Sequence, residues 1–450
     1  MSLVDEMAKF IVSEAAGKIG ENHRRRAIEH ILDTLGVGLA GNTDPIASSL
    51  LTYTERLGER GGYTLLGNAV SASLLQAAFV NGILCHALDY DDSSWRLIGH
   101  PSAVVLPSVM ATAESMDAGG RELVTAYLIG TEVSCKIGAA AEPELYQAGW
   151  HATGVVGVLG AAAGAGYLLG LSLDQMIHAL GIAASSASGL RQNFGSMTKP
   201  FHAGIAARNG VNAAYLAQCG FTSNPEALEG KTGFFANFAN KQPVLKESMG
   251  EPFDLLQPGF FVKPYPSCAA THTAIDAMLS LVKEYGCQAD QIESIYAGCG
   301  PVGPIMLVHN RPLQGTEGKF SMPFVLAAAV ADGEVGLDTF TDDKVNDPVI
   351  RGLMEKVEFG IDEQYRTRSV EEAPALIRVK LKDGRVLERS KQMADGSPEH
   401  PLSYEALIGK YRDCAGRVLT PDRVERSLEK IVFLDSLPRI SSLTTELRPG

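Results

Sequence analysis

Several features that would assign this 450-residue chain to a specialised class are scarce or missing. It has seven cysteines, scattered without a CxxC pair, so neither a disulfide framework nor a cysteine-based zinc site is expected. Basic residues are outnumbered, with 39 Lys and Arg against 52 Asp and Glu, which gives a net charge of −13. That balance argues against nucleic acid and anionic membranes as partners.

Long hydrophobic runs are also scarce. The one segment of membrane-spanning length is 152–171, roughly the twenty residues needed to cross a bilayer. It is rich in glycine and has no basic flank, so we expect a buried helix there. The N-terminal segment mixes acids and lysines with its apolar residues and lacks the apolar core of a signal peptide. A cytoplasmic protein with reduced thiols is therefore predicted.

Alanine-rich apolar segments dominate the first half of the chain. Residues 5–56 carry apolar side chains at helical spacing, as at Ala27, Ile31 and Leu35. From about residue 69 to 239, similar segments follow one another with short Gly, Asn and Pro interruptions, and strand patterns are nearly absent. This half of the chain is predicted to be helical.

The pattern changes near Pro258-Gly259. Beyond this point, 291–300 and 357–361 have strand character, and alternating runs in 375–390 flank Asp383-Gly384. An Asp-Gly pair in that setting predicts a β-hairpin with a type I′ turn. Helical patterns occupy 271–286 and 319–332 between these strands, and after residue 401 the chain is again helical by pattern.

These patterns predict a mainly α protein with two domains. An all-helical domain is expected to comprise residues 1–262 and 398–450, because the C-terminal helices follow an inserted segment of different texture. The insert, residues 263–397, is expected to form a smaller α+β domain.

The segment HALDYDDSS…GHPS at 86–102 concentrates ionisable side chains in an otherwise apolar region. On a continued helix, His86, Asp89 and Ser93 would share one face. His100 follows in the GHPS break, and a carboxylate beside an imidazole can fix its tautomer and raise its basicity. Two alternatives remain open: a solvated acidic helix end with a structural histidine, and a metal site formed by the same His and Asp residues.

Three further polar segments interrupt apolar chain. WHATG places His151 at the start of the next apolar helix, where the helix dipole disfavours a charged imidazolium. The other two segments contribute cationic and imidazole side chains, namely Arg191, Lys199 and His202 in 190–204 and Lys263 and His272 in 263–272. By contrast, His30 lies on an arginine-bearing helix and is expected to be a structural residue at the surface.

Together, these segments resemble the MmgE/PrpD family. The resemblance runs through HILDTLGVGLAG (30–41), HALDYDD, GHPSAVVLPS, WHATGVVG, TKPFHAG, KPYPSC and KFSMPF. The family includes 2-methylcitrate dehydratases, cis-aconitate decarboxylase and iminodisuccinate epimerase. The resemblance implies a helical domain with a smaller α+β lid domain, a site between them, no organic cofactor, no required metal and a homodimer.

The resemblance also implies roles for individual residues. Asp89 and Ser93 stand at the Asp and Thr positions of the decarboxylase site. Its active-site His, His, Lys and His positions are matched by His100, His151, Lys199 and His272.

Two departures from the known members limit the transfer of substrate specificity. Phe324 stands where the decarboxylase has a functional tyrosine, so a hydroxyl donor is absent there. The segment HPSAV (100–104) also differs from the HPSDN of the methylcitrate dehydratases.

The sequence therefore predicts a cofactor-independent acid–base enzyme for a small di- or tricarboxylate. Lyase chemistry, either dehydration or decarboxylation, is the first expectation, and epimerisation of a dicarboxylate such as iminodisuccinate is the alternative. A non-catalytic carboxylate-binding paralogue is the alternative from another class. His100, oriented by Asp89, is the predicted proton carrier, and His151 and His272 are candidates for the opposite proton transfer. The predicted substrate contacts are Ser93, Arg191, Lys199, His202 and Lys263.

Overall fold

The computed structural model describes residues 2–58, 60–367 and 373–449. The chain forms two compact units. The larger unit comprises residues 1–87, 91–260 and 403–450, and the smaller unit comprises 88–90 and 261–402. The predicted class is confirmed, because the larger unit is helical apart from one two-stranded ribbon and the smaller unit combines helices with a four-stranded sheet.

The larger unit contains most of the helices. In chain order they are α1 (Leu3–Lys9), a π-helical turn (Phe10–Glu14), α2 (Ala15–Lys18), α3 (Glu21–Ala40), α4 (Ile46–Leu57), α5 (Leu74–Ala87), α6 (Pro101–Ser115), α7 (Gly120–Ala141), α8 (Glu144–Gln147), α9 (Ala152–Val155), α10 (Gly157–Leu168), α11 (Leu173–Ser185), α12 (Thr198–Gln218), α13 (Phe234–Phe238), α20 (Tyr404–Gly416), α21 (Pro421–Val432) and α22 (Ser441–Thr444). Strands β1 (Tyr63–Thr64) and β2 (Ser71–Ala72) form the antiparallel ribbon.

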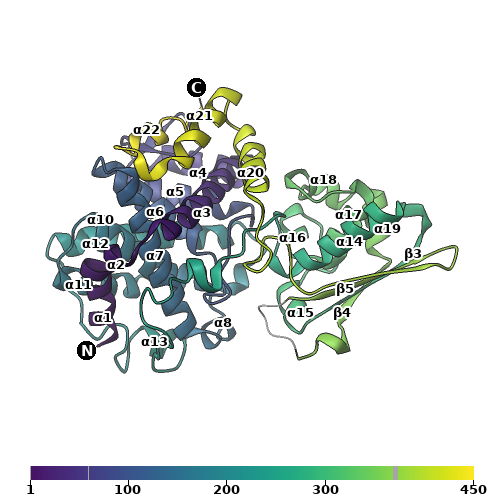
Figure 1. The fold of residues 1–450 in the computed structure, drawn as a ribbon, viewed down its shortest axis with the longest axis horizontal. Coiled ribbons are helices and arrows are strands. Elements are labelled where there is room, and N and C mark those ends of the chain that lie inside the picture. The colour runs from purple at the N-terminus through teal and green to yellow at the C-terminus, as the bar shows by residue number, and fades with distance from the viewer. Residues whose placement is uncertain (1, 59, 368–372, 450) are drawn as a thin grey trace. The chain divides into compact units, whose positions relative to one another are not determined.

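Small residues allow the central helices of the larger unit to approach closely. Helices α5, α6, α7, α10 and α12 pack on one another in this unit (Figure 1). At the crossing of α5 and α12, a Cβ on Gly204 would lie 2.4 Å from the carbonyl oxygen of Phe79, and one on Gly82 would lie 2.8 Å from the Cα of Gly204. No other residue fits either position without a shift of the backbone, so these two glycines fix the spacing of the two helices.

Helix α5 ends earlier than the sequence pattern suggests. The expectation that His86, Asp89 and Ser93 share a helical face is wrong, because α5 ends at Ala87. Asp89 has a left-handed backbone, with φ of 53°, which terminates the helical path. Aspartate is one of the few residues that tolerate this conformation.

Most of the uncharged segment 152–171 is buried inside the larger unit, as predicted, namely residues 152–166 and 171. It is divided between α9 and the twelve-residue α10, with Val156 between them. Throughout the described part of the chain, no helix combines the length and apolar content needed to cross a bilayer.

The smaller unit is built on a sheet of order β4-β3-β5-β6. Strand β3 (Ile292–Cys299) pairs in parallel with β4 (Val357–Ile361) and antiparallel with β5 (Ala375–Leu381), which pairs antiparallel with β6 (Val386–Lys391). Helix α14 (His272–Tyr285) packs on β5 and β6, and α17 (Met322–Asp332) packs on α14. The remaining helices are α15 (Val302–Met306), α16 (Gly315–Gly318), α18 (Asp342–Val345) and α19 (Pro348–Met354).

The predicted hairpin is confirmed, but its turn type is not. Gly384 has φ of 90°, whereas Asp383 is absent from the residues with positive φ, so the two positive values of a type I′ turn are not present. The N–H of Gly384 donates to the carbonyl of Leu381 at 3.0 Å, and the N–H of Leu381 donates to Arg385 at 2.8 Å. This is the pattern of a three-residue loop with one left-handed glycine.

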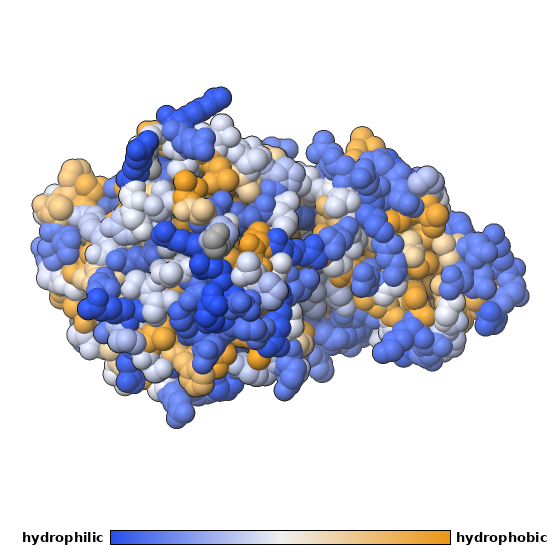
Figure 2. Space-filling view, turned by 90° about the horizontal axis from the view of Figure 1, so that it is seen from above, coloured by the Kyte–Doolittle hydropathy of each residue, from blue (hydrophilic) through white to orange (hydrophobic). Residues whose placement is uncertain are grey.

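Hydrophobic residues on one face of the surface are interspersed with hydrophilic ones. Figure 2 shows one face of the molecule, on which hydrophobic residues form separate groups among hydrophilic ones. Scattered apolar surface of this kind is normal for a folded protein. The expected homodimer therefore stays a prediction.

The α5–α12 crossing can be tested with one methyl group. We expect Gly204→Ala to lower the free energy of unfolding by roughly 1–3 kcal/mol or more, because the added carbon overlaps backbone. Gly409→Ala is the matched control, since Gly409 is exposed on α20 with open space around it. This control should raise stability by about 0.5–1 kcal/mol in urea unfolding. Equal stability of the two variants would contradict the close approach.

Candidate active site

Four histidine rings gather in the larger unit. His86 lies at the end of α5 and His202 in α12, while His100 and His151 directly precede α6 and α9. The ring centroids of His86 and His100 are 4.5 Å apart, those of His86 and His151 are 5.7 Å apart, and those of His151 and His202 are 5.3 Å apart. The structure thus brings together three predicted site residues, His100, His151 and His202, with His86.

Lys199 joins this cluster from the first turn of α12. Its side chain is buried, and its ammonium lies 5.5 Å from the centroid of the Phe194 ring, which is itself 4.9 Å from the His151 ring. The positive charge of Lys199 contributes to lowering the pKa of His86 and of His151. A buried cation beside neutral imidazoles is suited to receive an anionic ligand.

Asp91 is the carboxylate that contacts two of these rings. Its Oδ2 lies 2.9 Å from Nδ1 of His86 and 3.1 Å from Nδ1 of His100. Nδ1 of His100 also lies 2.8 Å from the backbone carbonyl of Asp92, which can only accept, so this nitrogen must carry a hydrogen. Each ring therefore donates from Nδ1, which leaves Nε2 as the nitrogen without a hydrogen when the ring is neutral.

Burial decides the charge state of this group. Burial lowers the pKa of His86 to about 3, against the opposing effect of Asp91. Burial also acts to raise the pKa of Asp91, but the two imidazoles outweigh it and hold that pKa well below its usual value. The group at neutral pH is an ionised Asp91 with a neutral His86.

His151 and His202 form a second imidazole pair. Their Nδ1 atoms are 3.0 Å apart. Burial lowers the pKa of His202 to about 4 and, together with the positive charge of Lys199, holds that of His151 well below its usual value. In a hydrogen-bonded pair of neutral imidazoles, one Nδ1 donates and the other accepts, so one of the two rings presents an Nε2–H.

The carboxylate of Asp92 has different partners from that of Asp91. Its Oδ2 accepts from Nδ1 of His30 at 2.7 Å and from the Ser102 hydroxyl at 2.6 Å, and Ser102 contacts the Tyr127 hydroxyl at 2.6 Å. The surface location expected for His30 is wrong, because this ring is fully buried. The position of His30 between Ala27 and Ile31 on the apolar face of α3 was the available sequence signal.

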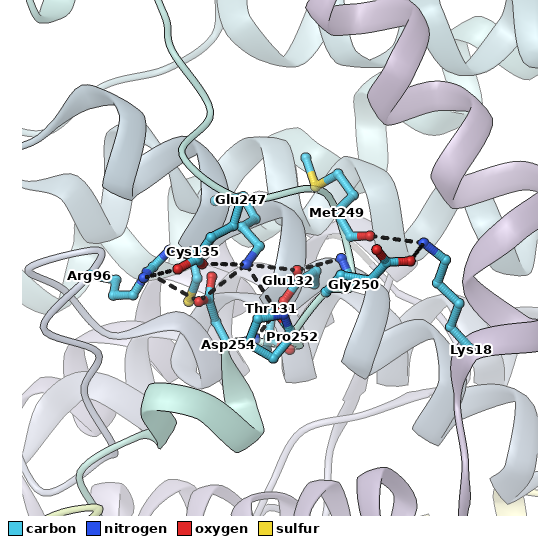
Figure 3. A network of polar contacts seen from close by, with 12 residues as sticks. Lys18, Arg96, Thr131, Glu132, Cys135, Glu247, Met249, Gly250, Pro252 and Asp254 are labelled. Carbon is cyan, nitrogen blue, oxygen red and sulfur yellow. Dashed lines mark hydrogen bonds and ion pairs between the residues drawn. The ribbon is translucent and has the colours of Figure 1, made fainter.

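An ion-pair network anchors the loop that carries Asp91 and His100. Arg96 contacts Glu247 at 2.5 Å and Asp254 at 3.1 Å (Figure 3). Lys136 lies 3.1 Å from Glu247. Glu132 accepts backbone N–H bonds from Gly250 and Asp254. Burial raises the pKa of Glu132 to about 7 and that of Asp254 to about 6. The loop is thereby fixed to α7 and to the 247–254 segment.

Other predicted site residues have different surroundings. In the smaller unit, Lys263 donates to the backbone carbonyl of Asp89 at 2.8 Å and pairs with its carboxylate at 3.1 Å. His272 is buried there at the start of α14, and its Nε2 donates to the Ser267 carbonyl at 3.1 Å.

Ser93 and Arg191 belong to the larger unit. Ser93 is buried in the loop after α5. The guanidinium of Arg191 stacks 3.6 Å from the centroid of the Tyr146 ring and donates to the Tyr146 carbonyl at 2.7 Å. The substrate-binding roles of both residues stay predictions.

Phe324 is fully buried in the hydrophobic core of the smaller unit, where its ring packs against Phe340.

A divalent cation is the alternative occupant of the Asp91 group. His86, Asp91 and His100 offer nitrogen and oxygen atoms at the mutual distances of metal ligands. The donor set fits a metal poorly in one respect, because both Nδ1 atoms face the carboxylate and carry hydrogens that an ion would have to displace. The hydrogen-bonded arrangement accounts for these contacts without an ion.

Comparison with known proteins identifies the family. The model of the MmgE/PrpD N-terminal domain matches residues 5–246, and that of the MmgE/PrpD C-terminal domain matches 265–435. The chain belongs to the MmgE/PrpD family. Its MmgE/PrpD relatives include human cis-aconitate decarboxylase, which is 32% identical over 99% of this chain and 95% of the relative.

Two further MmgE/PrpD relatives extend this result. Cis-aconitate decarboxylase of Aspergillus terreus is 26% identical, covering 98% of this chain and 95% of its own length. The mitochondrial 2-methylcitrate dehydratase of Yarrowia lipolytica is 25% identical, covering 79% and 73%. Both names denote lyases, and this chain is an enzyme of the same family and class.

Loss of Lys136 should weaken the anchored loop. We expect Lys136→Met to lower the free energy of unfolding by about 3 kcal/mol, because Glu132 and Asp254 lose a buried cation. Lys18→Met removes a more exposed ion pair to Glu251 and should cost about 1 kcal/mol or less. Urea unfolding of both variants measures the difference. A cost for Lys136→Met no greater than that of the control would show that the network does not stabilise the fold.

The buried histidines should make the fold sensitive to acid. Burial lowers the pKa of His202 to about 4 in the folded chain, whereas a histidine in an unfolded chain has a pKa of about 6.5, so between these pH values the unfolded chain binds the extra proton. Stability should fall on acidification by up to about 1.4 kcal/mol per pH unit from this residue. His202→Gln should show a smaller loss between pH 6.5 and 4.5 in urea unfolding. An unchanged slope would contradict the neutral pair.

Proposed function

We propose that this enzyme decarboxylates an unsaturated tricarboxylate of the cis-aconitate type without a cofactor. The observation that carries the proposal is the cluster of His100, Asp91 and the buried Lys199, in a chain 32% identical over nearly its full length to a cis-aconitate decarboxylase. The proposal includes two further points. The enzyme is a homodimer, and its substrate is a small polycarboxylate.

Lys199 has the role of binding a substrate carboxylate. An ammonium in a site of low polarity interacts with an anion more strongly than one at the surface, because water screens the pair less. Arg191, Ser93, His202 and Lys263 are proposed as further substrate contacts, and His272 as a group that polarises a carboxylate. The acidic surface of the chain gives these cations added importance for attracting an anion.

His100 has the role of proton carrier. In decarboxylation, the bond to the departing carboxylate breaks, CO₂ leaves and the electron pair stays on the substrate carbon. The imidazolium of His100 then donates its Nε2 proton to the substrate, and the ring is recharged from solvent. Nε2 is the exchanging atom because Nδ1 is held by Asp91 and the Asp92 carbonyl.

Dehydration is the second candidate. Here Nε2 of a neutral His100 removes a proton, and a second group must protonate the departing hydroxyl. The His151–His202 pair favours this reaction, because one of its rings presents an Nε2–H. The relationship to a 2-methylcitrate dehydratase supports the same alternative.

Proton NMR in D₂O distinguishes the candidates. The purified protein is incubated separately with cis-aconitate, citrate, 2-methylcitrate and iminodisuccinate. Decarboxylation releases CO₂ and places one deuterium in the product, and dehydration gives an alkene from a hydroxy acid. Deuterium exchange without net conversion would instead identify an epimerase, and binding without turnover of any acid would identify a non-catalytic paralogue. Either of these two results would overturn the proposal.

Replacement of the two principal residues should abolish most turnover. We expect His100→Gln and Lys199→Met each to lower kcat/KM by about 10²–10⁴-fold, which is the contribution typical of a positioned acid–base group. His178→Gln is the control, because His178 lies on α11 and its Nδ1 accepts from the backbone N–H of Ser223. Near-wild-type activity in a folded His100 variant would remove this residue from the mechanism.

A further inference from the structure

We propose that Asp91 is the positioning residue of the site, which aligns the rings of His86 and His100 and stabilises the charged form of His100. The inference deepens the proposed function and depends on it for the catalytic consequence. The orienting role predicted for Asp89 stays a prediction, and in the larger unit the carboxylate that contacts both rings is that of Asp91.

The geometry is that of one acceptor shared by two donors. Oδ2 of Asp91 receives Nδ1–H of both rings, and Oδ1 lies 3.1 Å from Nδ1 of His86. Asp91 and His86 are fully buried, whereas the side chain of His100 retains 12% exposure. His100 is therefore the ring of this pair that solvent or a ligand can reach, and His86 fixes the carboxylate from behind.

The two rings depend on Asp91 to different degrees. His100 has a second acceptor for its Nδ1–H, the carbonyl of Asp92 at 2.8 Å. A neutral His100 therefore keeps its tautomer without the carboxylate. What Asp91 adds for His100 is charge: a neighbouring anion stabilises the imidazolium over the neutral ring.

Asp91 is the nearest fixed anion to His100 in the larger unit. Cys85 next to it stays a thiol, because burial and the charge of Asp91 raise its pKa. His86 and His151 also face His100 in the larger unit and stay neutral through burial, and Lys199 carries a positive charge. In the larger unit, the positive charge of Lys199 disfavours the imidazolium of His100, and the carboxylate of Asp91 in contact with the ring stabilises it.

Asp92 provides a matched control. It is the next residue in the chain and is equally buried, but its carboxylate accepts from His30 and Ser102. Only its backbone carbonyl contacts His100. Asp92→Asn keeps that carbonyl and removes a neighbouring buried charge, whereas Asp91→Asn removes the charge that His100 contacts.

The first experiment needs no substrate. The titration of His100 is followed by NMR in ¹⁵N-histidine-labelled full-length protein, with the signal identified by its loss in His100→Gln. We expect Asp91→Asn to move the titration midpoint to lower pH by about one unit or more, because the imidazolium loses its counter-charge. Asp92→Asn should move it by less than half as much. Equal shifts in the two variants, or none, would overturn the assignment.

The second experiment measures turnover against pH with the acid found to be the substrate. Asp91→Asn should lower kcat by about 10²-fold or more with little change in KM, and the limb of the pH profile that reports the imidazolium should move to lower pH. Asp91→Glu retains the charge, so it should restore the position of that limb. Loss of activity without a shift of the limb would indicate a merely structural role and contradict the proposal.

The two experiments distinguish a failure of this proposal from a failure of the proposed function. If the wild-type protein converts none of the acids, the proposed function fails, while the NMR titration still decides the role of Asp91. If Asp91→Asn does not fold, the wild-type spectrum is decisive: His86 and His100 must both show the Nδ1–H tautomer at neutral pH, with His86 identified by His86→Gln. An Nε2–H tautomer at either ring would overturn the shared acceptor.

Discussion

The close crossing of α5 and α12 is the constraint on which the site depends. Two glycines, Gly82 and Gly204, let the backbones of these helices approach to within contact distance. His86 projects from the end of one helix and Lys199 and His202 from the start of the other, so the separation of the helices sets the separation of these side chains. A larger residue at the crossing would push the two helices apart. It would thereby displace His86, Lys199 and His202 without contacting any of them.

Burial of charge is the second organising feature of the larger unit. An ionised carboxylate in such a core is stable only with partners, and Asp91 and Asp92 each bind two donors. The buried Lys136 and Asp254 likewise have oppositely charged partners, since Lys136 pairs with Glu247 and Asp254 pairs with Arg96. Figure 3 shows the pair of Arg96 and Asp254. The polar groups of the 91–100 loop are thereby held in one arrangement, as a site that stabilises developing charge requires.

Local patterns predicted the elements well, because their determinants are local. The strand at 357–361 and the hairpin around Asp383-Gly384 follow from alternation and one turn glycine. The end of α5 was not predictable from spacing, since Asp89 can continue a helix or adopt a left-handed backbone. Partners such as His30 and Asp92, 62 residues apart, leave no periodic signal at all. The sequence identified the segment that carries the site, whereas the contacts of Asp91 with His86 and His100 became visible only in the structure.

The contact between His151 and His202 has a consequence for proton balance. Two neutral rings joined through Nδ1 expose one Nε2–H and one Nε2 lone pair. The ring with the Nε2–H can give up that proton, and the Nε2 lone pair of the other ring can accept one. If the proton between the two Nδ1 atoms then moves to the other nitrogen, the pair is again neutral, and the two rings have exchanged their donor and acceptor roles. Such a pair can supply and remove protons in one cycle while its net charge stays zero. In a buried setting this avoids the solvation cost that a single charged imidazole would incur.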